Sequence, residues 1–509
     1  MNTTSNKRIA KNTLMLYIRM FLVMLVTLYT SRVILNVLGV EDYGIYNIVG
    51  GVVVSFSVLS SAMSGAISRF ITFSLGEGNI QKVREFFATS VFVQISIGVL
   101  IIICAETIGI YLLNEQINIP EERRQATNVL FQFSLLTFTT KLLDIPLNAL
   151  IVSNERMSVF AYLGIVEVLL RLGVVFLLQL FCIDKLIMYG LLLWLVALLY
   201  LLFQYLYCKK KLSPQMAVPK YYKSSFKEMT GFASWNFIGT SAGILKNNGV
   251  DIIVNIFSNV SINAARGIAL QVYAAITSFS ENFLVALRPQ IVKSYAVSDK
   301  SRYTFLTEQG ARFSFYLLLF LTLPLILEID FVLSLWLKNI PPLASTFTQL
   351  QLVDALIASL SQTLVIVLLA SGKIRTYQLV VGGINLLNMP ISYLLLSLGF
   401  PVMITYVVLI FFNVVCLFAR LIFAKRQVGI SVKHYLSQVV VNTLYVAILS
   451  AIIPTIIINF IEPSWIRFLI IITLSTLTTA LTVFYIGMNK DERKFIMIQV
   501  NVLFNKFHS

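Results

Sequence analysis

Charged residues are scarce in this chain of 509 residues, where they make up 12% of the sequence, whereas a soluble domain carries about 25%. The hydrophobic class instead reaches 58%. Apolar runs long enough for a transmembrane helix, about 18 residues or more, recur along nearly the whole sequence. The shortage of charge excludes a soluble globular domain and predicts an all-α integral membrane protein.

Histidine and cysteine are also rare. The two histidines, His434 and His508, fall near an expected cytoplasmic edge and in the tail, which excludes a histidine-based site deep in the membrane. The four cysteines lie along apolar runs or at their ends without CxxC spacing, so neither a disulfide framework nor a metal site is predicted. A GxxxxGK phosphate loop is missing, so we expect no ATP hydrolysis by that route and no cofactor.

Acidic residues are fewer than basic ones, and the formal net charge is +16. A basic excess can indicate nucleic-acid binding, but here Lys and Arg gather in every second short connection between apolar runs. The intervening connections hold Arg123, Arg124, Lys185, Lys338 and Arg467. This asymmetry is the positive-inside pattern of membrane proteins. We therefore expect no nucleic-acid partner, and we expect both termini in the cytoplasm.

The apolar runs predict about fourteen transmembrane helices. The longest polar connection, CKKKLSPQMAVPKYYKSSFKE, carries six lysines and two prolines and follows the sixth of these helices. We therefore expect a six-helix lobe (1–212), a basic cytoplasmic linker (213–227), a second six-helix lobe (228–430) and a carboxyl-terminal helix pair with a basic tail (431–509). The expected spans are 13–38, 44–66, 86–112, 126–151, 158–181, 185–208, 228–257, 263–286, 308–336, 344–370, 376–398, 401–424, 436–460 and 464–487.

Two interrupted apolar stretches correspond between the lobes. VILNVLGVEDYGIYNIVGG in the first lobe aligns with IIVNIFSNVSINAARGIAL in the second, which pairs Asn36 with Asn255. Because both lobes are expected to start in the cytoplasm, the repeat is parallel and the lobes are pseudo-symmetric. The polar breaks are then outer turns, in which Gly39 and Gly44 relax the backbone and Asp42 faces water.

The motif LGVEDYGIYNIV, after a first span entered from a basic tail, resembles the start of polysaccharide transporter family members. These are flippases for lipid-linked oligosaccharides within the multidrug/oligosaccharidyl-lipid/polysaccharide (MOP) exporter superfamily. GFASWNFIGTSAGILKNNGVDIIVNIF is similar to that family's second lobe. The resemblance covers the whole chain in length and lobe plan. Fourteen spans are also similar to the lipid II flippase branch, in which the last two helices form a lipid groove.

This resemblance implies a MATE-like transporter in the bacterial cytoplasmic membrane. Its substrate would be a polyprenyl-pyrophosphate-linked oligosaccharide, such as a unit of lipopolysaccharide O-antigen or capsule, moved by alternating access. The bilayer and the polysaccharide polymerase machinery would be its partners. An alternative within the superfamily is a multidrug cation antiporter. A membrane-embedded polymerase or ligase is a third interpretation, but such an enzyme needs a sizeable extracytoplasmic loop that the sequence lacks, so we expect no enzyme.

A charge at mid-depth of a bilayer costs about 2.5–3.5 kcal/mol, so each charge inside an expected span needs a partner, a route to the interface or a cavity. Lys141 and Asp144 are three residues apart, and Glu167 and Arg171 are four apart. These spacings put each pair on one helical face and favour mutual neutralisation.

Other charged residues are candidates for transport. The resemblance implies that spans 1, 7 and 8 face a central cavity, and a lipid pyrophosphate needs cations to offset its desolvation. Four acids at depth could couple transport to H⁺ or Na⁺, or could pair with these cations. The substrate-binding candidates are Arg19, Lys246, Asn247, Asp251 and Arg266, and the ion-coupling candidates are Glu106, Glu281, Glu328 and Asp354.

Overall fold

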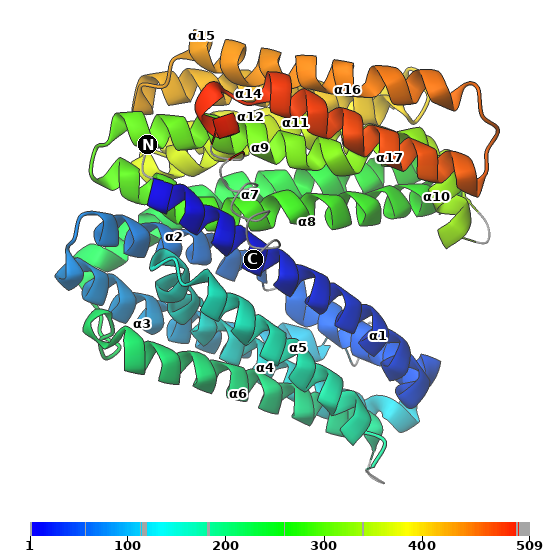
Figure 1. The fold of residues 1–509 in the computed structure, drawn as a ribbon. Helices are drawn as coiled ribbons and strands as arrows, with labels where there is room; N and C mark the ends of the chain where they lie inside the picture. The colour runs from blue at the N-terminus through cyan, green and yellow to red at the C-terminus, as the bar shows by residue number, and fades with distance from the viewer. Residues whose placement is uncertain are drawn as a thin grey trace, which may run out of the picture. The chain divides into compact units, whose positions relative to one another are not determined.

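The computed structural model describes residues 3–55, 57–111, 113, 120–180, 184–258, 260–337, 340–494 and 497. All regular secondary structure in these ranges is helical (Figure 1), as the sequence predicts. The chain divides into two compact units. Unit 1 comprises Met1–Ser241 and Ala286–Asp299, and unit 2 comprises Ala242–Val285 and Lys300–Ser509. Helices α7 (Lys223–Phe257) and α8 (Val260–Ala296) therefore contribute to both units.

Unit 1 is a helical bundle. Helices α4 and α6 share its most extensive contact. Helix α1 packs along α5, and α2 contacts α3 and α4. The last turn of the third helix widens into a π-helical segment, Ala105–Gly109. The helices are α1 (Thr3–Ser55), α2 (Ser57–Gly76), α3 (Ile80–Cys104), α4 (Glu121–Ser153), α5 (Met157–Leu177) and α6 (Lys185–Lys211).

Unit 2 is built around α11, which packs against both α9 and α14. Helices α16 and α17 form a pair, and α17 lies against α9. The helices are α9 (Lys300–Leu327), α10 (Ile329–Trp336), α11 (Ala344–Ser371), α12 (Arg375–Leu386), α13 (Asn388–Ser397), α14 (Ile404–Val428), α15 (Val432–Tyr435), α16 (Asn442–Ile458) and α17 (Trp465–Thr482), with π-helical segments at Leu436–Val441 and Val483–Gly487.

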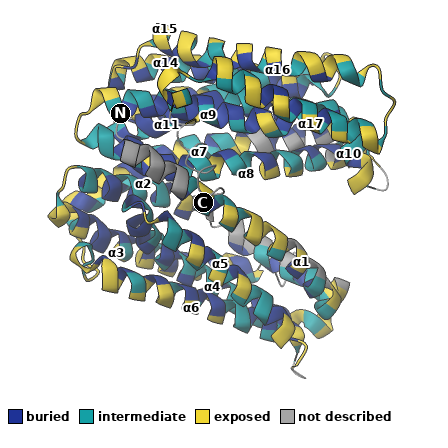
Figure 2. Cartoon of the chain, viewed as in Figure 1, coloured by how far each residue is buried: buried dark blue, intermediate teal, exposed yellow. Residues whose placement is uncertain are grey.

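Within the described ranges, 11 helices are long and apolar enough to cross a membrane, and a shorter apolar helical stretch covers Asn12–Thr27. Every expected span overlaps a helix of the structure, while the number of fourteen crossings stays a prediction. Large apolar side chains such as Leu444, Ile448 and Leu469 are exposed. Figure 2 shows exposed positions recurring along α16 and α17. Extensive apolar surface is unusual on a soluble monomer and suits a lipid-facing helix.

The first long helix is broken at one of the two glycines where the sequence predicts a turn. Gly39 alone leaves helical geometry within α1, with φ 81° and ψ 169°, and glycine tolerates this positive φ without steric cost. The helix resumes directly after it, so Gly44 is helical and takes no part in the turn. The expectation that Gly44 also relaxes the backbone was therefore wrong, because one glycine suffices to break the helix.

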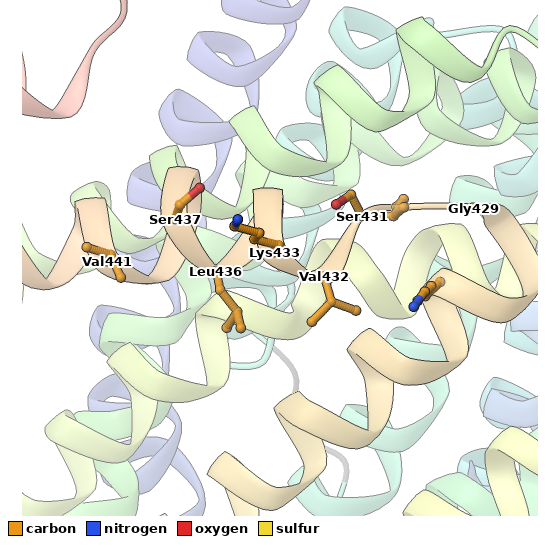
Figure 3. Close-up of a pocket in the computed structure, with 9 residues that line it drawn as sticks. Gly429, Ser431, Val432, Lys433, Leu436, Ser437 and Val441 are labelled. Carbon is orange, nitrogen blue, oxygen red and sulfur yellow. The ribbon is translucent and has the colours of Figure 1, made fainter.

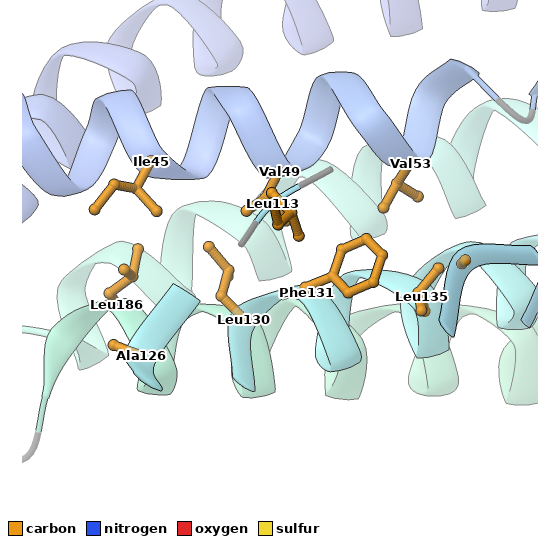
Figure 4. Packing of buried hydrophobic residues seen from close by; sticks show 10 residues of the cluster. Ile45, Val49, Val53, Leu113, Ala126, Leu130, Phe131, Leu135 and Leu186 are labelled. Carbon is orange, nitrogen blue, oxygen red and sulfur yellow. The ribbon is translucent and has the colours of Figure 1, made fainter. Parts of the chain in front are cut away.

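The segment after Gly39 carries an apolar face. Ile45, Val49 and Val53 recur at helical spacing and are buried against Leu130 and Phe131 of α4 (Figure 4). Offsets of four residues place the three side chains on one face of α1. This packing fixes the second half of α1 on the core of unit 1.

An ion cluster closes one end of unit 1. Arg123, in the first turn of α4, donates from Nε to Asp42 at 2.8 Å and from a terminal nitrogen to Asp184 at 2.6 Å. A second Arg123 nitrogen also contacts Asp42. Asp42 is thus half-buried and paired, whereas the sequence predicts that it faces water. The polar break supplies an anchor for α4 as well as a turn.

Two ion pairs hold the carboxyl-terminal helix pair and the segment after it on α9 and α10. Glu328, at the start of α10, is 1% exposed and accepts a hydrogen bond of 2.9 Å from Arg467 of α17. Arg467 Nε also lies 2.8 Å from Glu328, although its geometry is not that of a hydrogen bond. Beyond α17, Glu492 accepts a bond of 2.7 Å from Arg312 of α9. The pair is therefore an integral part of unit 2.

Candidate functional site

Arg19 of α1 is the candidate cation of unit 1. Its guanidinium lies over the ring of Phe160 on α5, 4.4 Å from the centroid. Gly164, one turn further along α5, leaves room for the side chain, because a Cβ there would overlap the guanidinium. Arg19 Nε is buried without a hydrogen-bond partner, and no carboxylate of the described residues lies within ion-pair distance of Arg19. The structure thus holds this cation by an aromatic face.

Neighbouring charges in unit 1 neutralise one another across two helices. Glu167 of α5 pairs with Arg171 at 2.7 Å, as its spacing predicts, and with Lys141 of α4 at 3.2 Å. The predicted pairing of Lys141 with Asp144 was wrong, since the nearest carboxylate to Lys141 comes from the adjacent helix. Asp144 is 5% exposed, and its Oδ1 has no hydrogen-bond partner.

Sequence reasoning missed three amides in unit 1, of which two are buried. Gln94 of α3 and Gln204 of α6 are both fully buried. Gln204 donates to Asn148 of α4 at 3.4 Å, while both amide atoms of Gln94 lack a partner. Buried amides are normally hydrogen-bonded to protein or to ordered water, so unit 1 offers unused hydrogen-bonding capacity. Their only sequence signal is a polar residue within an apolar run.

In unit 2 the structure brings two predicted residues together. Lys246 of α7 donates to Asn413 Oδ1 of α14 at 2.9 Å, and the amide nitrogen of Asn413 donates to Asp354 of α11. Asp354 is 3% exposed and Lys246 is 9% exposed. Asn413, which sequence reasoning missed, therefore links a buried cation to a buried carboxylate. The bridge joins three helices through one side chain that can both donate and accept.

Arg266 of α8 is buried in the core of unit 2. Its guanidinium lies 5.1 Å from the ring centroid of Tyr406, and one nitrogen lies 3.5 Å from Thr405 Oγ1. Tyr406 also stacks near Phe347, with centroids 5.0 Å apart. Apolar packing therefore surrounds this arginine on the α14 side.

The remaining candidates occupy separate environments. Glu106 lies exposed on the π-helical segment after α3, and Glu281 is exposed on α8. Glu328 is paired with Arg467, as described above. The side chains of Asn247 and Asp251 lie outside the described residues. Among the candidates whose side chains are described, the structure links Lys246 and Asp354 through Asn413.

A separate pocket, lined in part by two lysines, lies where α14 meets α15. It encloses about 780 Å³ and is lined by Lys425 and Lys433 together with serine and aliphatic side chains. Figure 3 shows Val432 and Leu436 pointing to one side of this segment and Ser437 to the other. None of the buried charged candidates lines it. Lysines at a helix end can extend toward the membrane surface while their stems cover apolar side chains.

Comparison with solved structures identifies the fold. A MATE transporter crystallised in the straight conformation is 11% identical, covers 84% of this chain and 96% of its own, and superposes with a TM-score of 0.73. A Vibrio cholerae MATE transporter in the bent form covers 84% of this chain and 98% of its own, at 12% identity and a TM-score of 0.67.

A third structure, from Pyrococcus furiosus, is described as a MOP superfamily transporter whose binding pocket has reversed polarity. It is 11% identical and covers 84% of this chain and 96% of its own, with a TM-score of 0.67. No protein-family model and no curated protein matches the sequence. The chain is therefore a multi-pass, all-helical membrane protein with the fold of MATE transporters of the MOP superfamily.

Proposed function

We propose that this protein is a flippase for a polyprenyl-pyrophosphate-linked oligosaccharide in the bacterial cytoplasmic membrane. It would carry the unit from the cytoplasmic to the outer leaflet by alternating access, with both termini in the cytoplasm. The transporter fold supports the class of function, and the resemblance of its first and seventh spans supports the substrate class. Sugar hydroxyls and a pyrophosphate need a polar path because hydrocarbon satisfies neither hydrogen bonds nor charge.

The observation that carries the proposal is the environment of Arg19. A buried cation normally pairs with an acid, because an isolated charge in a low-dielectric setting is strongly unfavourable. Arg19 is half-buried and instead rests on Phe160, and its buried Nε has no hydrogen-bond partner among the described residues. A phosphate oxygen would supply the missing acceptor, and arginine binds phosphate with several donors at once.

Lys246 and Arg266 would supply further positive charge in unit 2, and Asn247 and Asp251 would contact sugar. The bridge from Lys246 through Asn413 to Asp354 is a candidate for coupling to H⁺ or Na⁺. Protonation of Asp354, or its capture of a cation, would change the acceptor that holds Asn413 and hence Lys246. Glu106 and Glu281 stay weaker candidates for coupling, and the Arg467 pair favours a structural role for Glu328.

A multidrug cation antiporter is the second candidate, because Asp144 is a buried acid with an unpartnered oxygen. Two observations weigh against it. Within the described side chains, Arg19, Lys141 and Arg171 outnumber Asp144 and Glu167 in the same part of unit 1. The Pyrococcus furiosus structure is described as having a pocket of reversed polarity, so the polarity of the pocket differs between transporters of this fold.

Reconstituted liposomes separate the two candidates. The purified protein should translocate a fluorescent polyprenyl-pyrophosphate oligosaccharide, measured as loss of protection from an external glycosidase, and should leave a cationic dye untouched. Uptake of the dye driven by a pH or sodium gradient, without movement of the lipid-linked sugar, would establish the antiporter instead. Protein-free liposomes and the Arg19→Gln variant serve as controls.

A further inference from the structure

Unit 1 contains an apolar crevice that the transport proposal does not use. It encloses about 910 Å³, a volume within the range of small-ligand sites. Side chains of α3, α4 and α6 form its walls, and the chain that follows α6 covers one side. Its lining includes Val91, Ile95, Leu147, Leu202, Met216 and Lys209.

The covering chain, residues 213–219, is held in place by one contact within it and one just after it. Gln215 exchanges two hydrogen bonds with Asn154, at the end of α4, with distances of 2.7 and 3.1 Å. Beyond the crevice, Tyr221 lies against Phe92 of α3, with ring centroids 5.7 Å apart. Between these two contacts, Met216, Ala217, Val218 and Pro219 line the opening. The crevice is therefore built by ordered contacts on two helices.

One end of the crevice is basic. Lys209 lines it, and its ammonium lies 5.9 Å from the ring centroid of Tyr205. Lys210 and Lys211 follow in the last turn of α6. No carboxylate is among the described residues that line the crevice. This combination of a basic end with an apolar body complements a lipid that has an anionic head and a hydrocarbon chain.

We propose that this crevice binds one acyl chain of an anionic phospholipid of the cytoplasmic leaflet, with Lys209 at the lipid phosphate. Hydrocarbon fills an apolar crevice better than water does, because water there would lack hydrogen-bond partners. Each lysine near an anionic membrane surface contributes about 1 kcal/mol. The bound lipid would hold the linker that leads into α7. The inference does not depend on the transported substrate.

The test uses the full-length protein in vesicles that contain phosphatidylglycerol with a photoreactive diazirine in its acyl chain. After irradiation, mass spectrometry maps the labelled peptides. Labelling should concentrate on the residues 87–95, 143–147 and 213–219. Ala217→Trp and Leu202→Trp fill the crevice and should abolish this labelling. Leu206→Trp, one turn further along α6 and outside the lining, is the matched control and should retain it.

Charge recognition is tested separately. Lys209→Gln should lower labelling by phosphatidylglycerol about fivefold, which corresponds to about 1 kcal/mol. It should lower labelling by a phosphatidylcholine probe less, because the choline cation offsets the charge of that phosphate. Thermal unfolding of each variant reports whether the fold is intact. Equal labelling by both probes, uniform labelling of all apolar helices, unaltered labelling in the Trp variants, or displacement of the probe by a polyprenyl phosphate would each overturn the proposal.

Discussion

Arg19 and Lys246 illustrate two ways of keeping a cation inside an apolar unit. Arg19 lies on an aromatic face and has no acid partner among the described residues, whereas Lys246 reaches a carboxylate through an amide. The first arrangement leaves a donor unused and suits a ligand that brings its own negative charge. The second arrangement satisfies the cation within the protein, and it suits a carboxylate whose charge changes when it binds a proton or a metal ion.

Gly164→Ala tests the position of Arg19 without changing its charge. The added methyl would overlap the guanidinium and should move it off Phe160. Because a hydrogen bond to a charged group contributes about 1.5–3 kcal/mol, flipping of the lipid-linked sugar in liposomes should fall about tenfold or more. Gly173→Ala on the same helix is the matched control, since a Cβ there meets nothing within 4 Å. Equal activity of the two variants would argue against a role for this position.

A double-mutant cycle tests the bridge through Asn413. Lys246→Gln and Asp354→Asn should each lower the thermal stability of the detergent-solubilised protein, because each leaves a buried charge with a weakened partner. The double variant should lose less stability than the two single variants lose together. The difference, which is the coupling free energy, should be about 0.5–3 kcal/mol, as for residues in one network. Additive losses of stability would mean that Asn413 does not couple Lys246 to Asp354.

At the scale of helices, the carboxyl-terminal pair is joined to α9 and α10 by the ion pair of Glu328 with Arg467. Glu328→Gln should lower the free energy of unfolding by about 3–5 kcal/mol, because it leaves the largely buried side chain of Arg467 without an acid. Fluorescence-monitored thermal unfolding measures the change, and the exposed Glu462→Gln is the control. A variant of normal stability that fails to transport would instead assign Glu328 to ion coupling.

The cluster of Arg123, Asp42 and Asp184 predicts a pH dependence. Burial of Asp184 opposes its ionisation, but hydrogen bonds from Arg123 and from the backbone of Ile187 and Leu186 outweigh it and lower the pKa of this carboxyl. A depressed pKa stabilises the fold above the unfolded-state value of about 3.9, and this stability is lost as pH falls below it. The melting temperature should therefore drop between about pH 4 and pH 3, and less so in Asp184→Asn.

The helices and their order could be predicted from the sequence, because the length of apolar runs and the position of charges follow from crossing a membrane. The partners of the buried charges could not be predicted in this way. The spacing of Lys141 and Asp144 indicated a pair within one helix, but Lys141 contacts Glu167 on the neighbouring helix. Arg467 looked like an ordinary loop charge, although it closes on buried Glu328. Asn413 gave no signal, since its role arises only when three helices meet.

At the scale of the whole chain, two compact units share α7 and α8. Each unit keeps its own polar residues, with half-buried Arg19 and buried Gln94 and Gln204 in unit 1 and the Asn413 bridge in unit 2. Helices that belong to both units can transmit a change in one of them to the other, which is what alternating access requires. We propose that the chain flips an anionic lipid-linked sugar and that Arg19 meets its phosphate.

The most direct test is complementation of a flippase-deficient bacterial strain, with accumulation of the lipid-linked intermediate as the readout. The parent protein should clear the intermediate, and Arg19→Gln at equal membrane abundance should restore its accumulation. Arg19→Lys should retain part of the activity, because it keeps the charge but loses the multidentate contact. Full clearance by Arg19→Gln would contradict the account and make this arginine structural.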